Sequence, residues 1–97
     1  MIVRNMVQIP KHDSFFILGP RQTGKSTLVR AWLKSRKHFE INLLLQTDYK
    51  KYSAEPDLLA KEVLYQIQTN KIKHVFIDEI QRVPELLDVV QSLIDQA

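Results

Sequence analysis

Two groups of residues in this chain have the types and the spacing needed to handle phosphate. The first group is the segment 19–26, whose pattern Gly-x-x-x-x-Gly-Lys-Ser predicts a P-loop. Its glycines allow the backbone to curl so that N–H groups point inward at an anion, and a helix that follows adds a partial positive charge. Lys25 can reach the β- and γ-phosphates of a nucleotide, and the Ser26 hydroxyl can ligate Mg²⁺. The residues expected to bind the nucleotide are Gly19, Pro20, Arg21, Gln22, Thr23, Gly24, Lys25, Ser26 and Thr27.

The second group is the adjacent acid pair Asp78 and Glu79, which follows the apolar run 75–77. In an open parallel sheet, ligands bind at the carboxyl ends of the strands, so we expect this pair at the same edge as the P-loop. Asp78 would then hold Mg²⁺ together with Ser26, and Glu79 would orient or deprotonate the attacking water. This interpretation makes the run a Walker B element, with Glu79 and Lys25 as the catalytic residues. The alternative is that the acids only begin a turn or cap the next helix.

The elements that must position these groups alternate between strands and helices. Segments 15–18 and 75–77 are apolar at every position, which is typical of parallel strands buried on both faces. Segment 39–45 alternates and then becomes continuously apolar, which also predicts a strand. Three strands, each followed by a helix, predict an α/β fold of the P-loop NTPase type, a parallel sheet flanked by helices. The expected helices begin at Lys25, Pro56 and Pro84.

The segments between these elements are less regular. Residues 1–14 mix apolar and polar positions, and we expect a lead-in with a short helix that Pro10 ends. Residues 46–55 are polar and predict a solvated loop, although their interleaved Tyr and Lys residues could also stack on bases and hold phosphates. The basic run 34–38 is expected to offset the dipole at the end of a helix, with a nucleic-acid patch as the alternative. The spacing of the histidines suggests no metal site; they are His12, His38 and His74.

Composition bounds the class of protein. A chain of 97 residues, 44% of them hydrophobic, provides for one small domain and one core. The absence of Cys excludes disulfides and thiolate metal sites. No apolar run approaches the ~20 residues that span a bilayer, and no signal peptide is visible, so we expect a cytoplasmic protein with no membrane partner. The net charge of +3 fits phosphate binders, nucleic-acid binders and ordinary basic domains alike.

Segments 19–27 and 76–87 together resemble AAA+-like P-loop ATPases of bacteria and archaea, especially the family that carries a C-terminal domain of unknown function. The second segment, Phe-Ile-Asp-Glu-Ile-Gln-Arg-Val-Pro-Glu-Leu-Leu, is the more distinctive of the two. The resemblance extends over nearly all of the chain from Phe15. It implies that the chain binds ATP and Mg²⁺, with Glu79 as the catalytic carboxylate. The residues that it assigns to binding are Gly24, Lys25, Ser26, Thr27 and Asp78.

The resemblance also implies a longer protein. Members of that family continue into a further strand with a polar sensor residue, an arginine that senses the γ-phosphate and the C-terminal domain, and none of these follows Ala97. We therefore expect residues 1–97 to be the N-terminal part of a P-loop ATPase domain, a truncated AAA+-like core whose partner is its own C-terminal region beyond residue 97. The expected parts are a lead-in (1–14), a strand, P-loop and helix (15–37), a second strand and helix (38–72) and the Walker B strand and helix (73–97).

In proteins that this chain resembles, the sensor strand lies between the P-loop strand and the Walker B strand. Without it, we expect the backbone groups of strand 15–18 to be unpaired on one side. The chain should then order its strands abnormally or associate with a second copy of itself.

The leading functional hypothesis is an ATPase module in which Mg²⁺-dependent hydrolysis drives a conformational change. The alternative is a nucleotide-dependent switch, or a DNA-associated binding module, with little turnover. A small-molecule kinase fits less well, because a glutamate beside the metal-binding aspartate favours hydrolysis and no acceptor-binding motif is visible. The roles of two arginines are left undecided by the sequence. Arg21 could touch phosphate or a neighbouring subunit, or it could be an exposed loop residue. Arg82 could supply a charge to the site of a neighbouring subunit, or it could face solvent.

Overall fold

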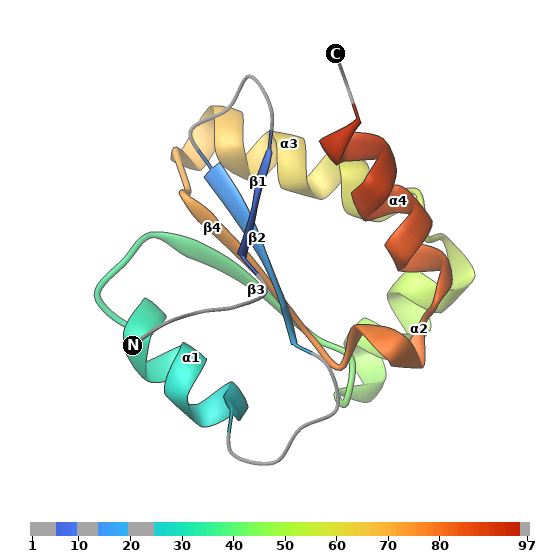
Figure 1. The fold of residues 1–97 in the computed structure, drawn as a ribbon. Helices are drawn as coiled ribbons and strands as arrows, with labels where there is room; N and C mark the ends of the chain where they lie inside the picture. The colour runs from blue at the N-terminus through green and yellow to red at the C-terminus, as the bar shows by residue number, and fades with distance from the viewer. Residues whose placement is uncertain (1–5, 10–13, 20–24, 96–97) are drawn as a thin grey trace.

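The computed structural model describes residues 6–9, 14–19 and 25–95, which form a sheet with helices on both faces (Figure 1). Helix α1 covers one face, and α2, α3 and α4 cover the other. This arrangement confirms the predicted α/β fold. None of the described helices is long and apolar enough to cross a membrane. The elements are β1 (Met6–Ile9), β2 (Ser14–Gly19), α1 (Lys25–Leu33), β3 (His38–Asn42), α2 (Gln46–Ala54), α3 (Leu58–Asn70), β4 (His74–Asp78), the 3-10 helix η1 (Ile80–Arg82) and α4 (Glu85–Ile94).

The sheet has the strand order β1-β2-β4-β3. Strands β2, β4 and β3 run parallel, as a repeated strand-helix order predicts, whereas β1 is antiparallel to β2. The expectation of a short helix in the lead-in 1–14 is therefore wrong, because Met6–Ile9 is a strand. So short a segment is not stable as a helix by itself, whereas pairing with β2 satisfies backbone groups of both strands and buries Ile9.

Strand β2 is paired along both of its sides. β1 pairs with it in antiparallel register, and β4 pairs with it in parallel register up to Gly19 opposite Asp78. The expectation that one side of this strand would lack backbone partners is therefore wrong, because β1 and β4 supply them. β2 pairs directly with β4, with no strand between them. Self-association stays a prediction.

The two faces of the sheet bury different side chains, because successive residues of a strand point to opposite faces. On β4, Val75 and Ile77 belong to the larger core beneath α2, α3 and α4, whereas Phe76 packs with Leu33 of α1. The side chains of residues 75–77 are fully buried, as a run that is apolar at every position predicts. The same alternation places Asp78 on the face that α1 covers.

Residues 46–54 form helix α2 rather than the solvated loop that their polar composition predicted. Tyr52 is buried in the larger core, and Tyr49 packs against that core. Strand β3 ends at Asn42, earlier than expected, and the turn 43–45 leads into α2. Burial of aromatic rings stabilises a helix that the local composition does not favour. Because Tyr52 is buried, its ring is not accessible for stacking on bases, and the contact of Tyr49 and the Lys residues with nucleic acid stays an untested alternative.

Candidate functional site

Three parallel strands end in one row at the carboxyl edge of the sheet. Gly19 at the end of β2 lies opposite Asp78 at the end of β4, and Asp78 in turn lies opposite Asn42 at the end of β3. The first residue of the P-loop pattern and the first acid of the Walker B pair are thus neighbours, as their places after two strands predicted. Asn42 completes the row, and sequence reasoning did not single it out.

Gly19 and Asp78 approach each other so closely that the position favours glycine. A Cβ atom on Gly19 would lie 2.9 Å from Asp78 Oδ1 and 3.1 Å from a carbon of the Phe76 ring. The carbonyl oxygen of Gly19 also accepts a hydrogen bond from the Glu79 N–H at 2.8 Å. The start of the P-loop pattern and the acid pair are therefore held together by a backbone hydrogen bond and by close packing.

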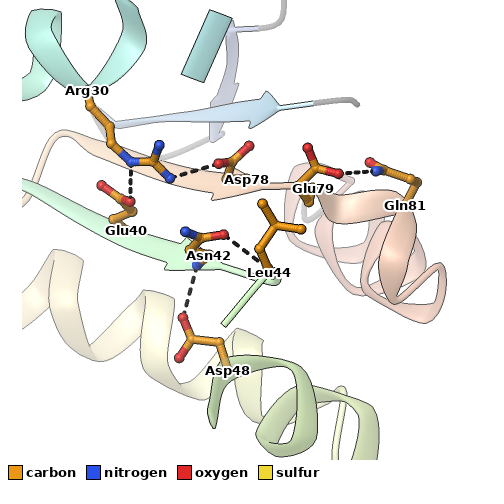
Figure 2. Close-up of polar contacts among 8 residues, drawn as sticks. All are labelled: Arg30, Glu40, Asn42, Leu44, Asp48, Asp78, Glu79 and Gln81. Atoms are coloured by element: carbon orange, nitrogen blue, oxygen red, sulfur yellow. Dashed lines mark hydrogen bonds and ion pairs between the residues drawn. The ribbon is translucent and has the colours of Figure 1, made fainter. Parts of the chain in front are cut away.

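Asp78 is buried, with 2% of its surface exposed, and Arg30 provides a counter-charge. Arg30 Nη2 donates to Asp78 Oδ2 at 2.7 Å, and Arg30 Nε donates to Glu40 Oε2 at 2.7 Å (Figure 2). Burial acts to lower the pKa of Arg30, but the hydrogen bonds and charges of Glu40 and Asp78 outweigh it, so that this pKa is raised. A buried carboxylate with no cation beside it would destabilise the fold, and Arg30 removes that penalty.

Sequence reasoning missed both Arg30 and Glu40. A signal was present, because an acid at the end of a strand buried on both faces needs a cation nearby. The segment 25–37 contains several basic residues, however, and nothing in their spacing distinguishes one as the partner. Only the packing of α1 against β4 shows that Arg30 is the basic residue that pairs with Asp78.

Glu79 has a left-handed backbone conformation, with φ 60° and ψ 43°. This conformation costs a residue with a Cβ atom about 1–2 kcal/mol, and such strain is concentrated at functional sites. The turn sends the two adjacent acids in different directions. The Glu79 carboxylate accepts a hydrogen bond from Gln81 Nε2 at 2.6 Å, whereas the Asp78 carboxylate faces Arg30 (Figure 2). Glu79 is therefore a partly exposed acid beside a buried one.

The turn between β3 and α2 borders Asp78 on its other side. The Asn42 N–H donates to Asp48 Oδ2 at 2.9 Å, and the Asn42 side-chain oxygen accepts from the Leu44 N–H at 3.0 Å (Figure 2). The Leu43 N–H donates to the carbonyl oxygen of Asp78 at 3.1 Å. These hydrogen bonds fix the backbone around Asp78 without using its carboxylate.

The middle of the P-loop pattern, residues 20–24, lies outside the described residues. Lys25, Ser26 and Thr27 form the first turn of α1, so a helix begins where the pattern requires one. The contacts predicted between these residues and a nucleotide or Mg²⁺ stay predictions. The site residues outside the described part of the chain are Pro20, Arg21, Gln22, Thr23 and Gly24.

His74 lies at the opposite, amino edge of the sheet. Its ring stacks on Phe15 and meets Trp32 edge-on, with centroid distances of 6.1 Å and 5.0 Å. Among the residues that the structure describes, none is a hydrogen-bond partner of the buried Nδ1 atom. Burial, followed by the charges of Arg36 and His38, lowers the pKa of His74. Within the described part of the chain, no three His, Cys, Asp or Glu side chains are grouped as a metal site would require.

Two further residues that the sequence singled out have partners within the fold. The exposed Arg82 guanidinium lies over the ring of Tyr49, 5.2 Å from its centroid. Lys51 forms an ion pair with Glu62 at 2.5 Å, and the Tyr52 hydroxyl donates to the same carboxylate. Neither Arg82 nor Lys51 therefore requires a partner molecule to account for its position.

A comparison with protein families matches most of the chain to one family model. Residues 11–97 match a family model described as an AAA domain. The matched range includes the whole P-loop pattern, the acid pair and the strands that position them. Comparisons with curated proteins and with solved structures gave no match.

Proposed function

The chain belongs to the AAA domain family of P-loop NTPases, and we propose that it binds ATP with Mg²⁺ at the carboxyl edge of its sheet and hydrolyses the nucleotide. The observation that carries this proposal is the register of Gly19 and Asp78. The P-loop pattern begins at the first of these residues, and the second is a buried carboxylate. Hydrolysis needs a phosphate-binding loop and a metal-binding carboxylate at one strand edge, and this register supports that arrangement.

The residues at this edge fit a magnesium ion by their chemistry. Mg²⁺ prefers oxygen ligands and is usually bound through one or two carboxylates together with the phosphates of the substrate. The Asp78 carboxylate is such a ligand, and it lies opposite Gly19, the first residue of the P-loop pattern. Asp78 and the Ser26 hydroxyl would hold the ion, which neutralises the negative charge that develops on the transferred phosphoryl group.

The chain's own groups would carry out the rest of the reaction. Backbone N–H groups of residues 21–27 and the Lys25 ammonium would bind the phosphates and stabilise their charge. Glu79 would orient the attacking water and accept its proton. The hydrogen bond from Gln81 restrains the Glu79 side chain, so that its carboxylate is held at the same edge before a nucleotide arrives.

Calorimetry with ATP and Mg²⁺ tests the binding half of this proposal. The wild type should bind, and Lys25→Ala should bind much more weakly, because it lacks the charge on the β- and γ-phosphates. The matched control is Lys61→Ala, which removes an exposed lysine of α3 on the other face of the sheet. Equal affinity of all three proteins would contradict a nucleotide site at the P-loop.

Phosphate release tests the catalytic half. Glu79→Gln preserves the size of the side chain and should bind ATP normally, but it should release phosphate about 10²–10⁴-fold more slowly, the usual contribution of a general base. If the wild type and Glu79→Gln both bind ATP and release phosphate equally slowly, the nucleotide-dependent switch is the better explanation.

A second candidate function, association with nucleic acid, is favoured by cations at the amino edge of the sheet. Two basic segments, 34–38 and 71–74, are adjacent there, because the Lys73 N–H donates to the Lys37 carbonyl oxygen at 3.2 Å. Neither segment contains Asp or Glu, and a surface of one sign attracts a phosphate backbone. The exposed cations of these segments are Lys34, Arg36, Lys37, Lys71 and Lys73.

Fluorescence anisotropy with a single-stranded oligonucleotide tests this second function. The double variant Lys37→Ala/Lys73→Ala should bind more weakly, and the slope of log K against log salt should decrease by about 0.7 for each phosphate that the variant no longer neutralises. Lys50→Ala/Lys61→Ala is the control, since it removes the same charge from exposed positions on α2 and α3. If the wild type does not bind at low salt, or if both double variants weaken binding equally, the amino edge is not a nucleic-acid surface.

A further inference from the structure

Arg30 joins two carboxylates that come from different strands. Its Nε contacts Glu40 of β3 and its Nη2 contacts Asp78 of β4, each at 2.7 Å. The guanidinium carbon also lies over the Phe76 ring, 5.6 Å from its centroid. Because separate nitrogen atoms serve the two acids, Arg30 can release one carboxylate and keep the other (Figure 2).

The two carboxylates differ in their exposure to solvent. The Asp78 side chain is 2% exposed, whereas the Glu40 side chain is 28% exposed. Water can therefore replace Arg30 at Glu40, whereas the buried carboxylate of Asp78 is stabilised by a positive charge close by. Arg30 supplies that charge on α1. A divalent cation at the same carboxylate would supply it as well, and two cations at one carboxylate repel each other.

We propose that Arg30 is a positioning residue that holds Asp78 in the metal-free protein and gives up Asp78 Oδ2 when Mg²⁺ and ATP bind, while Glu40 keeps the guanidinium. This inference rests on the proposed function. Arg30 holds the buried carboxylate in a fixed orientation until the metal arrives, and the energy needed to release Arg30 weakens metal binding by a fixed amount. Metal affinity then depends on the strength of the contact between Arg30 and Asp78. Substitutions of Arg30 or Glu40 that weaken this contact should tighten metal binding, and those that strengthen it should weaken metal binding.

The test uses Mn²⁺ as the probe, because its binding is measured by electron paramagnetic resonance in the presence of a non-hydrolysable ATP analogue, without turnover. Arg30→Met removes the competing charge and should tighten Mn²⁺ binding by at least about tenfold, the smaller end of the effect of an opposite charge on a carboxylate. Glu40→Gln removes the acid that shares Arg30 with Asp78, and it should weaken Mn²⁺ binding by about two- to fivefold.

Thermal unfolding provides a second readout. Without metal, Arg30→Met should unfold at a lower temperature than the wild type, because Asp78 has lost this counter-charge. With saturating Mn²⁺ and analogue, the difference should close, since the bound cation now supplies the charge in both proteins. The control is Lys61→Met, which removes an exposed cation of α3 and should change neither measurement.

Opposite shifts in Mn²⁺ affinity for the two variants support the inference. Unchanged affinities, or weaker binding by both, would show that Arg30 only stabilises the fold, and they would overturn the inference while the proposed function stands. If the wild type binds no Mn²⁺ with the analogue, both fail. If Arg30→Met does not fold, Glu40→Gln decides: weaker binding than wild type supports the inference, and unchanged or tighter binding overturns it.

Discussion

Gly19 and Asp78 lie opposite each other at the ends of two paired parallel strands, and only a hydrogen atom of Gly19 fits between them. A Cβ atom on Gly19 would lie 2.9 Å from Asp78 Oδ1 and 3.3 Å from the Asp78 Cα. Contacts this short are avoided in proteins because close-packed interiors have no room to absorb an added methyl group. The first glycine of the P-loop pattern therefore has a packing function.

Gly19→Ala should lower the free energy of unfolding by about 1–3 kcal/mol, because the added methyl group overpacks the Asp78 carboxylate and the Phe76 ring. Urea denaturation measures this loss. In an Asp78→Ala background the same substitution should cost less, and the double-mutant cycle should give a coupling of at least about 0.5 kcal/mol. Strictly additive losses would mean that Asp78 does not limit the size of residue 19.

The left-handed conformation of Glu79 predicts an unusual order of stabilities. Glu79→Gly should be more stable than Glu79→Ala by up to about 1 kcal/mol. Glycine removes the strain at φ 60°, and this gain exceeds the free-energy cost of the extra conformational entropy that glycine loses on folding. Chemical denaturation of both variants measures the difference. The control is the same pair of substitutions at Gln81 in η1, where Gln81→Ala should be more stable than Gln81→Gly. If alanine is also the better residue at position 79, the backbone there is not strained.

His74 should make folding sensitive to mild acid. Burial, with the charges of Arg36 and His38, lowers its pKa in the folded protein, whereas the unfolded chain has the ordinary value of 6.5. The unfolded state then binds the proton more readily, so the contribution to stability is complete above pH 6.5 and is lost as the pH falls from 6.5 towards the lower folded pKa.

His74→Phe removes the titrating ring and keeps an aromatic side chain between Phe15 and Trp32. Urea unfolding at about pH 7.5 and about pH 5.5 compares the two proteins, and the variant should lose less stability than the wild type across this interval. The same pH dependence in both proteins would show that His74 does not contribute to it.

The Tyr52 hydroxyl should stabilise the α2–α3 pair. This side chain is 1% exposed, and its hydroxyl donates to Glu62, which also forms an ion pair with Lys51. Burial raises the pKa of Tyr52, and the hydrogen bond to Glu62 adds to the shift. Tyr52→Phe should lower the free energy of unfolding by about 1–3 kcal/mol, with unchanged ATP affinity. Glu62→Gln retains an acceptor and should cost less. Equal stability of Tyr52→Phe and wild type would contradict a net contribution.

Much of the scaffold could be predicted because its signals are local. The run 75–77 is apolar at every position, and such a run is most stable as a strand buried on both faces, as β4 is. Gly19 and Asp78 each follow a strand of this kind, so their common edge could be predicted before any strand order was known. The start of α1 at Lys25 likewise follows from the motif spacing.

Other parts of the fold depend on contacts between distant segments. Met6–Ile9 is a strand because β2 offers it a backbone partner, and no pattern within four residues can show that. Residues 46–54 are a helix because Tyr52 enters the larger core. The composition of this segment predicted a polar loop, because composition does not distinguish the exposed side chains from the buried Tyr52.

The sequence by itself predicted which residues would bind phosphate and metal, and it determined that Gly19 and Asp78 lie at the ends of strands in a parallel sheet with helices. Only the tertiary structure decided the strand order, the added strand β1 and the partnership of Arg30 with Asp78. The physical reason is the range of the forces involved. Hydrophobic periodicity and loop chemistry act between neighbours in the chain. The counter-charge of a buried acid is whichever cation the packing brings close, here across 2.7 Å from α1 to β4.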